Sequence, residues 1–299
     1  MNLFLFVACV FIWGSTWIAI TFQVGHVDPV VAVAWRFSIA VFVLGAWILI
    51  RRRSFKMPAS SHLKAGMVGL FLYTLDYSFL YAAQQYMVSA LLAVLSSSVI
   101  YFTVLFRRVL LRKPVRMEVL IGASLGLVGI AMIFAPEFQS MTLEQGLGLG
   151  LFFALVSFIC AAIGNIISES ILDEGTPVLQ MNFYAMGYGL IFIYGFGLVT
   201  SVSYSLPGDT DFYLALLYLA VFGSVLAFGA YMKLLQRVGS DKATYVVLVY
   251  PIVALGLSTL FEGYQWTFIA AGGVVFVLIG NAIAMGKMNK LLRIEPSAN

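Results

Sequence analysis

The chain has 299 residues, of which 62% are hydrophobic and only 10% are charged, and its mean hydropathy is +1.00. A soluble domain carries about 25% charged residues to cover its surface, so this composition excludes an ordinary soluble protein and predicts a membrane protein. The net charge of +4 does not indicate nucleic-acid binding, because the basic residues are spread over short loops.

Ten apolar segments follow one another along the chain, separated by short polar turns. A helix needs roughly 20 apolar residues to cross the hydrocarbon layer. The segments cover approximately residues 3–22, 30–50, 63–83, 87–111, 117–135, 147–170, 178–200, 211–235, 241–262 and 266–286. We expect the first to be a span, not a cleavable signal peptide, because no basic region precedes it. The prediction is an all-α membrane protein with ten transmembrane helices.

The distribution of Lys and Arg predicts the orientation of these spans. Cytoplasmic loops are enriched in basic residues. Of the 17 basic residues, 16 lie in the connections at 51–64, 107–116 and 233–242 and in the tail, which all fall on one side, whereas the alternate connections contain none. We therefore expect both termini to be cytoplasmic, in the cell (inner) membrane. Arg36 is the one basic residue inside a span.

The two parts of the chain repeat a pattern of a short turn, a long span, another turn and a Gly-rich last span. The string "EVLIGASLGLVGIAMIF" in the first part corresponds to "TFIAAGGVVFVLIGNAIAM" in the second. Ten spans divide into five plus five, and an odd number inserts the second half with the opposite orientation. Such inverted repeats are typical of transporters, with the substrate site where the halves meet. The expected units are 1–136, 146–287 and a cytoplasmic tail at 288–299.

The motifs also resemble those of a known family. "FIWGSTW" in the first span, "WRF" in the second, "AVFGSVLAF" in the eighth and "YVVLVYPIVALGLSTLFEGYQWT" in the ninth are similar to the EamA-type transporters of the drug/metabolite transporter superfamily. The resemblance implies a ten-helix carrier that exports amino acids or similar small metabolites. Two departures stand out: "SSSVIYF" replaces a segment that usually contains proline, and Arg112–Lys113 replace an acidic residue after the fourth span.

Two opposite charges within the second and third spans are the leading site candidates. Arg36 lies six residues into its span, ~9 Å deep, and Asp76 lies eight residues from the end of the next span, ~12 Å deep. Charges inside a membrane pair with each other or face water. We predict that the two residues pair. The pair either staples the two spans together or lines the cavity, where Arg36 binds a substrate carboxylate and Asp76 binds an amine or a proton.

Other polar and aromatic residues within the spans are further candidates for substrate binding. Trp13 and Trp17 lie four residues apart on one helix face, deeper than an interfacial belt. Amides in hydrocarbon need partners, so the two asparagines are either glue between helices or substrate contacts. Two or three of the tyrosines are expected to touch substrate, and Pro251 allows a kink that suits a gating helix. The remaining candidates are Asn165, Asn182, Tyr77, Tyr101, Tyr184, Tyr245 and Tyr250.

The sequence argues against the rival classes. His26 and His62 both lie in loops, so no span offers a zinc site or a base for a nucleophile. Cys9 and Cys160 are expected to be packing residues, and we expect no catalytic site, metal or cofactor. The expected partners are a small-molecule metabolite and the lipid bilayer, with a monomer or a dimer both open. An uptake permease is the alternative function, and a membrane receptor or scaffold is the rival from another class.

Overall fold

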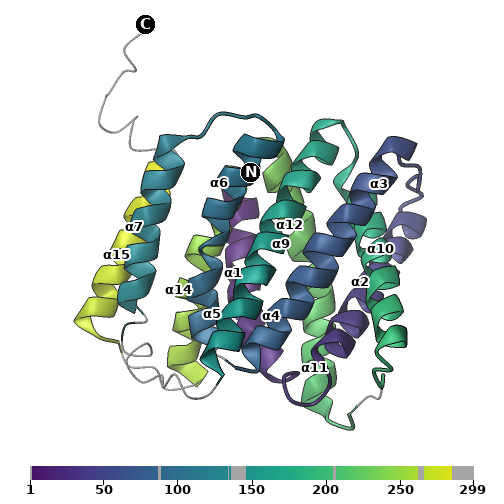
Figure 1. Ribbon diagram of the computed structural model, residues 1–299, viewed down its shortest axis with the longest axis horizontal. Helices are drawn as coiled ribbons and strands as arrows, with labels where there is room; N and C mark the ends of the chain where they lie inside the picture. The colour runs from purple at the N-terminus through teal and green to yellow at the C-terminus, as the bar shows by residue number, and fades with distance from the viewer. Residues whose placement is uncertain are drawn as a thin grey trace, which may run out of the picture.

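The computed structural model describes residues 2–86, 89–133, 135, 146–204, 207–261 and 266–284. The predicted tail at 288–299 lies outside these residues. The described part consists of helices that run side by side, as Figure 1 shows, and it contains no strand beyond an isolated bridge between Val24 and Val27. The helices are α1 Asn2–Thr21, α2 Pro29–Ile50, α3 Ala59–Val68, η1 Gly69–Leu75, α4 Asp76–Gln84, α5 Ser89–Ser96, α6 Val99–Leu110, α7 Met117–Ile133, α9 Leu147–Asp173, α10 Val178–Val199, α11 Thr210–Tyr218, η2 Leu219–Leu226, α12 Ala227–Val238, α13 Ser240–Ala243, α14 Val246–Phe261 and α15 Phe268–Ala284.

Several of these helices are long and apolar enough to cross a membrane. Within the described residues there are six, and two shorter apolar helices accompany them. The six cover Asn2–Thr21, Pro29–Ile50, Gly148–Asp173, Val178–Val199, Thr210–Val238 and Ser240–Leu257. Each of the ten predicted segments contains helix. The all-helical class is therefore as expected, and ten crossings stay a prediction.

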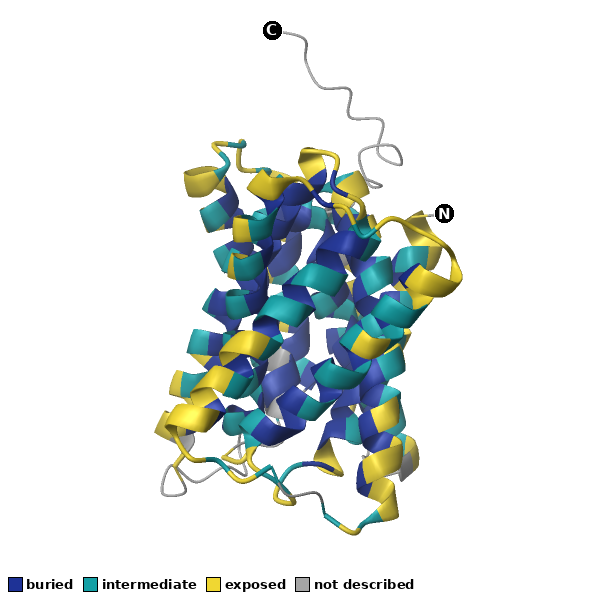
Figure 2. Ribbon diagram, turned by 90° about the vertical axis from the view of Figure 1, so that its right-hand side faces the viewer, coloured by how far each residue is buried: buried dark blue, intermediate teal, exposed yellow. Residues whose placement is uncertain are grey.

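Large apolar side chains cover much of the outer surface along the sides of the molecule. Phe42 is 76% exposed and Phe268 is 99% exposed. Figure 2 shows dark blue, buried residues along the inner faces of the helices and yellow, exposed residues on their outer faces and at the ends. Water would penalise such a surface, whereas lipid does not. The arrangement is that of a protein embedded in a bilayer.

Local sequence signals explain where individual helices begin. The Asp28 side chain accepts a hydrogen bond from the backbone N–H of Val30, at 2.8 Å, and Pro29 occupies the first helical position of α2. Asp209 caps α11 in the same way, accepting from the N–H of Asp211 at 3.1 Å. An acidic cap satisfies one of the free N–H groups at a helix start, and proline has no N–H that needs a partner there.

Two π-helical segments interrupt long helices at comparable places. The segment η1 joins α3 to α4, and η2 joins α11 to α12. In each, a hydroxyl donates to the carbonyl five residues earlier: Thr74 to Gly69 at 3.0 Å, and Ser224 to Leu219 at 3.1 Å. A π-helical turn is wider than an α-helical turn and is frequent at functional sites. Asp76 begins α4 directly after η1.

Glycines bring α7 and α15 into close contact. A Cβ atom on Gly129 would lie 2.5 Å from the carbonyl oxygen of Gly273, closer than any real contact. The two helices lie side by side at one edge of the molecule (Figure 1). Small residues allow membrane helices to approach this closely. The Gly-rich strings of these two helices therefore form a close packing seam.

Helices from the two parts of the chain alternate around the centre of the molecule. The first helix, α1, packs against α12 and α14, while α2 packs against α10 and η2 and α4 packs against α9. Side chains from both parts therefore face the same central space. This arrangement puts the candidate site at the centre, between the two parts of the chain.

Candidate functional site

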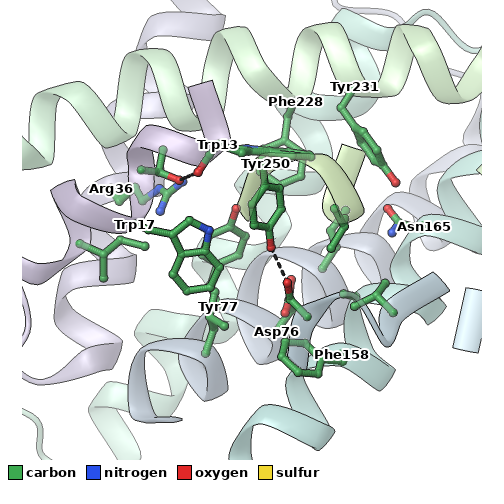
Figure 3. A pocket seen from close by; sticks show the side chains of 18 residues that line it. Trp13, Trp17, Arg36, Asp76, Tyr77, Phe158, Asn165, Phe228, Tyr231 and Tyr250 are labelled. Atoms are coloured by element: carbon green, nitrogen blue, oxygen red, sulfur yellow. Dashed lines mark hydrogen bonds between the residues drawn. The ribbon is translucent and has the colours of Figure 1, made fainter. Parts of the chain in front are cut away.

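A cavity of about 110 Å³ lies at the centre of the molecule, between elements from both parts of the chain. Figure 3 shows its side chains converging from α1, α2, α4, α9, α12 and α14. The wall consists of aromatic and aliphatic side chains with a few polar groups. It is lined by Trp13, Thr16, Trp17, Ile20, Arg36, Leu72, Asp76, Tyr77, Leu80, Ser96, Val99, Phe158, Ala161, Asn165, Phe228, Tyr231, Val247 and Tyr250.

The guanidinium of Arg36 is held by neutral groups. The residue is only 1% exposed. Its Nε donates to the hydroxyl of Ser224 at 2.9 Å, and its Nη1 donates to the hydroxyl of Tyr81 at 3.3 Å. The Cζ atom lies 4.7 Å from the centroid of the Tyr77 ring, a cation–π contact that stabilises a desolvated cation. These contacts explain how a guanidinium is stabilised inside a membrane span.

The predicted ion pair between Arg36 and Asp76 is not formed. Among the ion pairs of the described residues, none joins them; Asp76 instead accepts a hydrogen bond from the Ser157 hydroxyl at 2.6 Å. Similar depth on neighbouring helices did not bring the charges together, because Arg36 turns towards η2 while Asp76 turns towards α9. Both side chains still line the cavity (Figure 3). The cavity therefore contains a cation and a carboxyl group that do not neutralise each other directly.

The two predicted tryptophans form part of the aromatic wall. The Nε1 of Trp13 donates to the carbonyl of Gly223 at 3.1 Å, and its ring lies 5.2 Å from Phe228 and 4.9 Å from Tyr231. The Trp17 ring lies 5.9 Å from that of Tyr250. Such edge and tilted contacts are the favoured geometries of aromatic pairs. The wall is therefore a packed aromatic surface.

Two further predicted residues supply polar atoms to the cavity. Asn165 is 5% exposed, and its Oδ1 has no hydrogen-bond partner among the described residues. The hydroxyl of Tyr250 shares a hydrogen bond of 2.5 Å with that of Ser96. A buried acceptor without a partner costs free energy, so a donor that enters the cavity would be favoured beside Asn165.

Four other predicted residues lie outside the cavity, where their polar groups bind neighbouring elements. Asn182 accepts from Tyr73 at 3.2 Å, a contact between α10 and η1. The three tyrosines donate to groups on adjacent segments: Tyr101 to Ser124 at 3.1 Å, Tyr184 to the Phe55 carbonyl at 3.0 Å and Tyr245 to the Val119 carbonyl at 2.5 Å. The structure gives these four residues packing partners and does not bring them to the candidate site.

Several lining residues were not predicted from the sequence. Phe158, Phe228 and Tyr231 lie within apolar runs, where nothing distinguishes a ring that faces a cavity from one that faces lipid. Ser96 belongs to the string "SSSVIYF", whose three consecutive serines were the available signal, and the structure places it directly before the break between α5 and α6 at residues 97–98. Broken helices often border transporter sites.

Neither cysteine belongs to a disulfide or a metal site in the described part of the chain. Cys9 is fully buried, and its thiol contacts the carbonyl of Ala227 at 3.6 Å. Cys160 is 6% exposed and also free. No group of three or more His, Cys, Asp or Glu residues is gathered for a metal within those residues. The prediction that both cysteines are packing residues agrees with their burial.

A membrane-embedded helical protein with a central cavity walled by two parts of one chain has the form of a carrier. The chain matches the EamA-like transporter family over residues 1–135 and 148–286. The chain belongs to this family, and it is a membrane transporter and not an enzyme.

Relatives of this chain are named as transporters. It is 29% identical over 283 residues to the "Uncharacterized inner membrane transporter YedA" of Escherichia coli, covering 92% of this chain and 88% of the relative. It is 23% identical to an "Uncharacterized transporter" of Archaeoglobus fulgidus, over 92% and 95% of the two chains, and 24% identical to "Protein PagO" of Salmonella typhimurium, over 84% and 82%. A solved crystal structure shares the fold, with a TM-score of 0.77, 17% identity and coverage of 97% and 98%.

Proposed function

We propose that this transporter exports amino acids or similar small metabolites by alternating access, with the central cavity as the substrate site. One observation carries the proposal: Arg36 and Asp76 line one cavity and do not pair with each other. Buried charges without an opposite partner are costly in a membrane protein. A zwitterion brings a carboxylate for the guanidinium and an ammonium group for the carboxylate, so its two ends match the cavity.

The aromatic wall supports a substrate with an apolar part. Trp13, Trp17 and Tyr77 line the same cavity as the two charged groups (Figure 3). Aromatic rings bind apolar groups through large contact areas and bind cations over their faces. We therefore place the side chain of the substrate against these rings, with Asn165 accepting a hydrogen bond from it.

The proposed carrier consists of ten spans in two inverted halves, 1–136 and 146–287. The matching positions of η1 and η2 support the repeat, because each lies within the third long helical stretch of its half. Their hydroxyl-to-carbonyl bonds, from Thr74 and Ser224, have the same five-residue spacing. The contact between α7 and α15, the last helices of the halves, is also what a pseudo-symmetric pair would give.

The proposed orientation has both termini, and the tail at 288–299, in the cytoplasm. Figure 1 places the N-terminus at the same end as the basic connections 51–58 and 111–116. Arg237 donates to the Asn2 side chain at 3.1 Å, which ties another basic residue to that end. Basic residues accumulate on the cytoplasmic side of a membrane, which supports this sidedness.

We assign Pro251 a gating role in α14. Proline has no N–H to donate to the carbonyl four residues earlier, which here belongs to Val247. Val247 lines the cavity, and α14 continues through Pro251 without a break. A missing hydrogen bond at this point lowers the cost of bending α14 beside the substrate.

Counterflow in proteoliposomes tests the function. Purified protein would be reconstituted with a panel of labelled amino acids, at two pH gradients. We expect counterflow of at least one amino acid, lost in Arg36→Gln and retained in Arg51→Gln, which removes an exposed arginine stacked on Trp47. Equal counterflow by Arg36→Gln would contradict the assignment of the site. No response to any amino acid would exclude that substrate class, and efflux from energised cells decides the direction.

A further inference from the structure

A second cluster of buried charges lies beyond the cavity, at the end of the molecule where the N-terminus lies. Arg107 of α6 binds both carboxylate oxygens of Glu169 on α9 through its Nε, at 3.2 Å each, and through its Nη2 at 3.1 Å. Its Nη1 lies 3.4 Å from Asp241 on α13. These three side chains are 7%, 1% and 3% exposed. They form a buried layer that joins three helices.

Further donors complete this layer. Lys113 donates to Glu169 at 2.7 Å and to Asp173 at 2.8 Å, and the Nε of Arg116 lies 3.4 Å from Asp241. The backbone N–H and the hydroxyl of Ser240 also donate to Glu169, at 3.1 and 2.5 Å. Three cations therefore meet three carboxylates, and Glu169 receives hydrogen bonds from α6, from the connection that follows it, and from α13.

The charged layer lies directly over one end of the cavity. On α9, Asn165 lines the cavity and Glu169 follows one turn later, about 6 Å along the axis. On α6, Val99 lines the cavity and Arg107 follows about 12 Å further on. The layer thus lies between the cavity and the end that carries the basic connections.

The chemistry of this layer suits a contact that opens and closes. Separating apolar helices exposes hydrophobic surface, whereas separating ions into water restores their hydration. A buried ion pair is close to energetic balance against its desolvation, although removing one partner alone is costly. The glycine seam between α7 and α15 has no such compensation, because backbone packs closely against backbone there and no ionised side chain takes part in the close contacts. Of these two contacts, the charged layer is therefore the one better suited to separate.

We propose that Arg107, Glu169 and Asp241 form the gate that closes the cavity on the side of the basic connections, and that this cluster separates when the cavity opens there. The inference rests on the proposed alternating access and adds which residues seal one side. First-half α6 and second-half α9 and α13 move apart at this gate, while the opposite side closes.

Thiol labelling in membrane vesicles tests the gate. Cys9 and Cys160 would be replaced by alanine, and Ala161→Cys would place one thiol in the cavity wall. A membrane-impermeant methanethiosulfonate would be added from each side, with Arg112→Cys as the marker of sidedness. Glu169→Gln and Asp241→Asn weaken the gate. Lys64→Gln is the control, because it removes a more exposed ion pair, with Glu174, between α3 and the end of α9.

If the cluster is a gate, the rates of labelling from the two sides should change in opposite directions. In Glu169→Gln and Asp241→Asn, we expect labelling from the side of the basic connections to rise at least about tenfold, since an uncompensated buried charge destabilises the closed state. Labelling from the other side should fall, and Lys64→Gln should leave both rates unchanged. A rise without the reciprocal fall, or no rise in either variant, would overturn the proposal.

Two controls keep this test separate from the proposed function. If Glu169→Gln and Asp241→Asn elute as aggregates in size-exclusion chromatography, Arg116→Gln replaces them, because it removes only the 3.4 Å contact with Asp241. Unchanged labelling in Arg116→Gln would then overturn the gate. If the parent protein shows counterflow but labelling is unchanged in the variants, the gate is rejected and the proposed function stands. If labelling changes reciprocally but no amino acid shows counterflow, the gate is supported and the assigned substrate class is rejected.

Discussion

Arg36 and Ser224 lie 188 residues apart in the chain, and the Nε of Arg36 donates to the Ser224 hydroxyl at 2.9 Å. The same hydroxyl donates to the Leu219 carbonyl within η2. The arginine from the first part of the chain is therefore oriented by a π-helical turn of the second part. Any movement of the two parts relative to each other changes the position of the guanidinium in the cavity.

The first prediction concerns the geometry of Arg36. Arg36→Lys keeps the positive charge but loses the planar group that reaches Ser224 and Tyr81 at once. We expect substrate affinity to fall by about tenfold in Arg36→Lys and by more in Arg36→Gln, because a bidentate contact to a carboxylate is lost. Quenching of the protein's tryptophan fluorescence by substrate, to which Trp13 and Trp17 in the cavity wall contribute, measures the affinity. Equal affinity in both variants and the parent would contradict a binding role.

The second prediction separates the two charged groups by substrate chemistry. If Asp76 receives the ammonium group, Asp76→Asn should weaken binding of an amino acid by about tenfold or more. Binding of the deaminated analogue, which has no ammonium group, should change little. Ser157→Ala is the matched control, since it removes the 2.6 Å donor to Asp76 and keeps the carboxyl group. Equal losses for the amino acid and its analogue would reject this assignment.

The third prediction contrasts two asparagines. Asn165 has an unpartnered Oδ1 in the cavity wall, whereas Asn182 accepts from Tyr73 between α10 and η1. Asn182→Leu should destabilise the protein by about 1–3 kcal/mol, because the Tyr73 hydroxyl loses its partner. Asn165→Leu should leave the melting temperature unchanged and weaken substrate binding. Thermal unfolding in detergent and the fluorescence assay measure the two effects, and the reverse pattern would exchange the two roles.

The fourth prediction concerns the seam between α7 and α15. Gly129→Ala forces backbone against backbone at Gly273 and should lower stability by about 1–3 kcal/mol. Gly272→Ala on α15 is the control, because its added Cβ would meet only the flexible end of Met132, at 3.4 Å. Thermal unfolding should show a clear loss in the first variant and little change in the second. Equal melting temperatures would mean that the seam relaxes freely.

Much of the fold could be predicted from local patterns. Apolar segments of sufficient length are helical in lipid because no other local conformation satisfies the backbone. The pairing of Arg36 with Asp76 could not be predicted in the same way. Helical rise gives the depth of a residue, but side-chain direction depends on the neighbours that offer a hydrogen bond, here Ser224 and Ser157.

The residues of the candidate site could likewise be predicted only in part. Deep polar residues such as Asp76 and Asn165 were recognisable because hydrocarbon penalises them. Among the aromatic candidates, Tyr77 and Tyr250 line the cavity, whereas Tyr184 and Tyr245 bind backbone carbonyls of other segments. All four lie in similar apolar strings. The face that a tyrosine presents is set by the rotation of its helix against several neighbours.

The sequence by itself determined that this protein is a helical membrane protein, that its charges are concentrated at one end, and that it is a relative of the EamA-like transporters. Composition and the length of the apolar segments suffice for the membrane class, because they reflect the solvent that each segment meets, whereas the family resemblance rests on the motifs. Only the tertiary structure decided that Arg36 and Asp76 turn to different walls of one cavity and that Glu169 is buried among cations. Those outcomes depend on contacts between residues tens to hundreds of positions apart in the chain. Local sequence patterns do not reveal which of these residues meet in space.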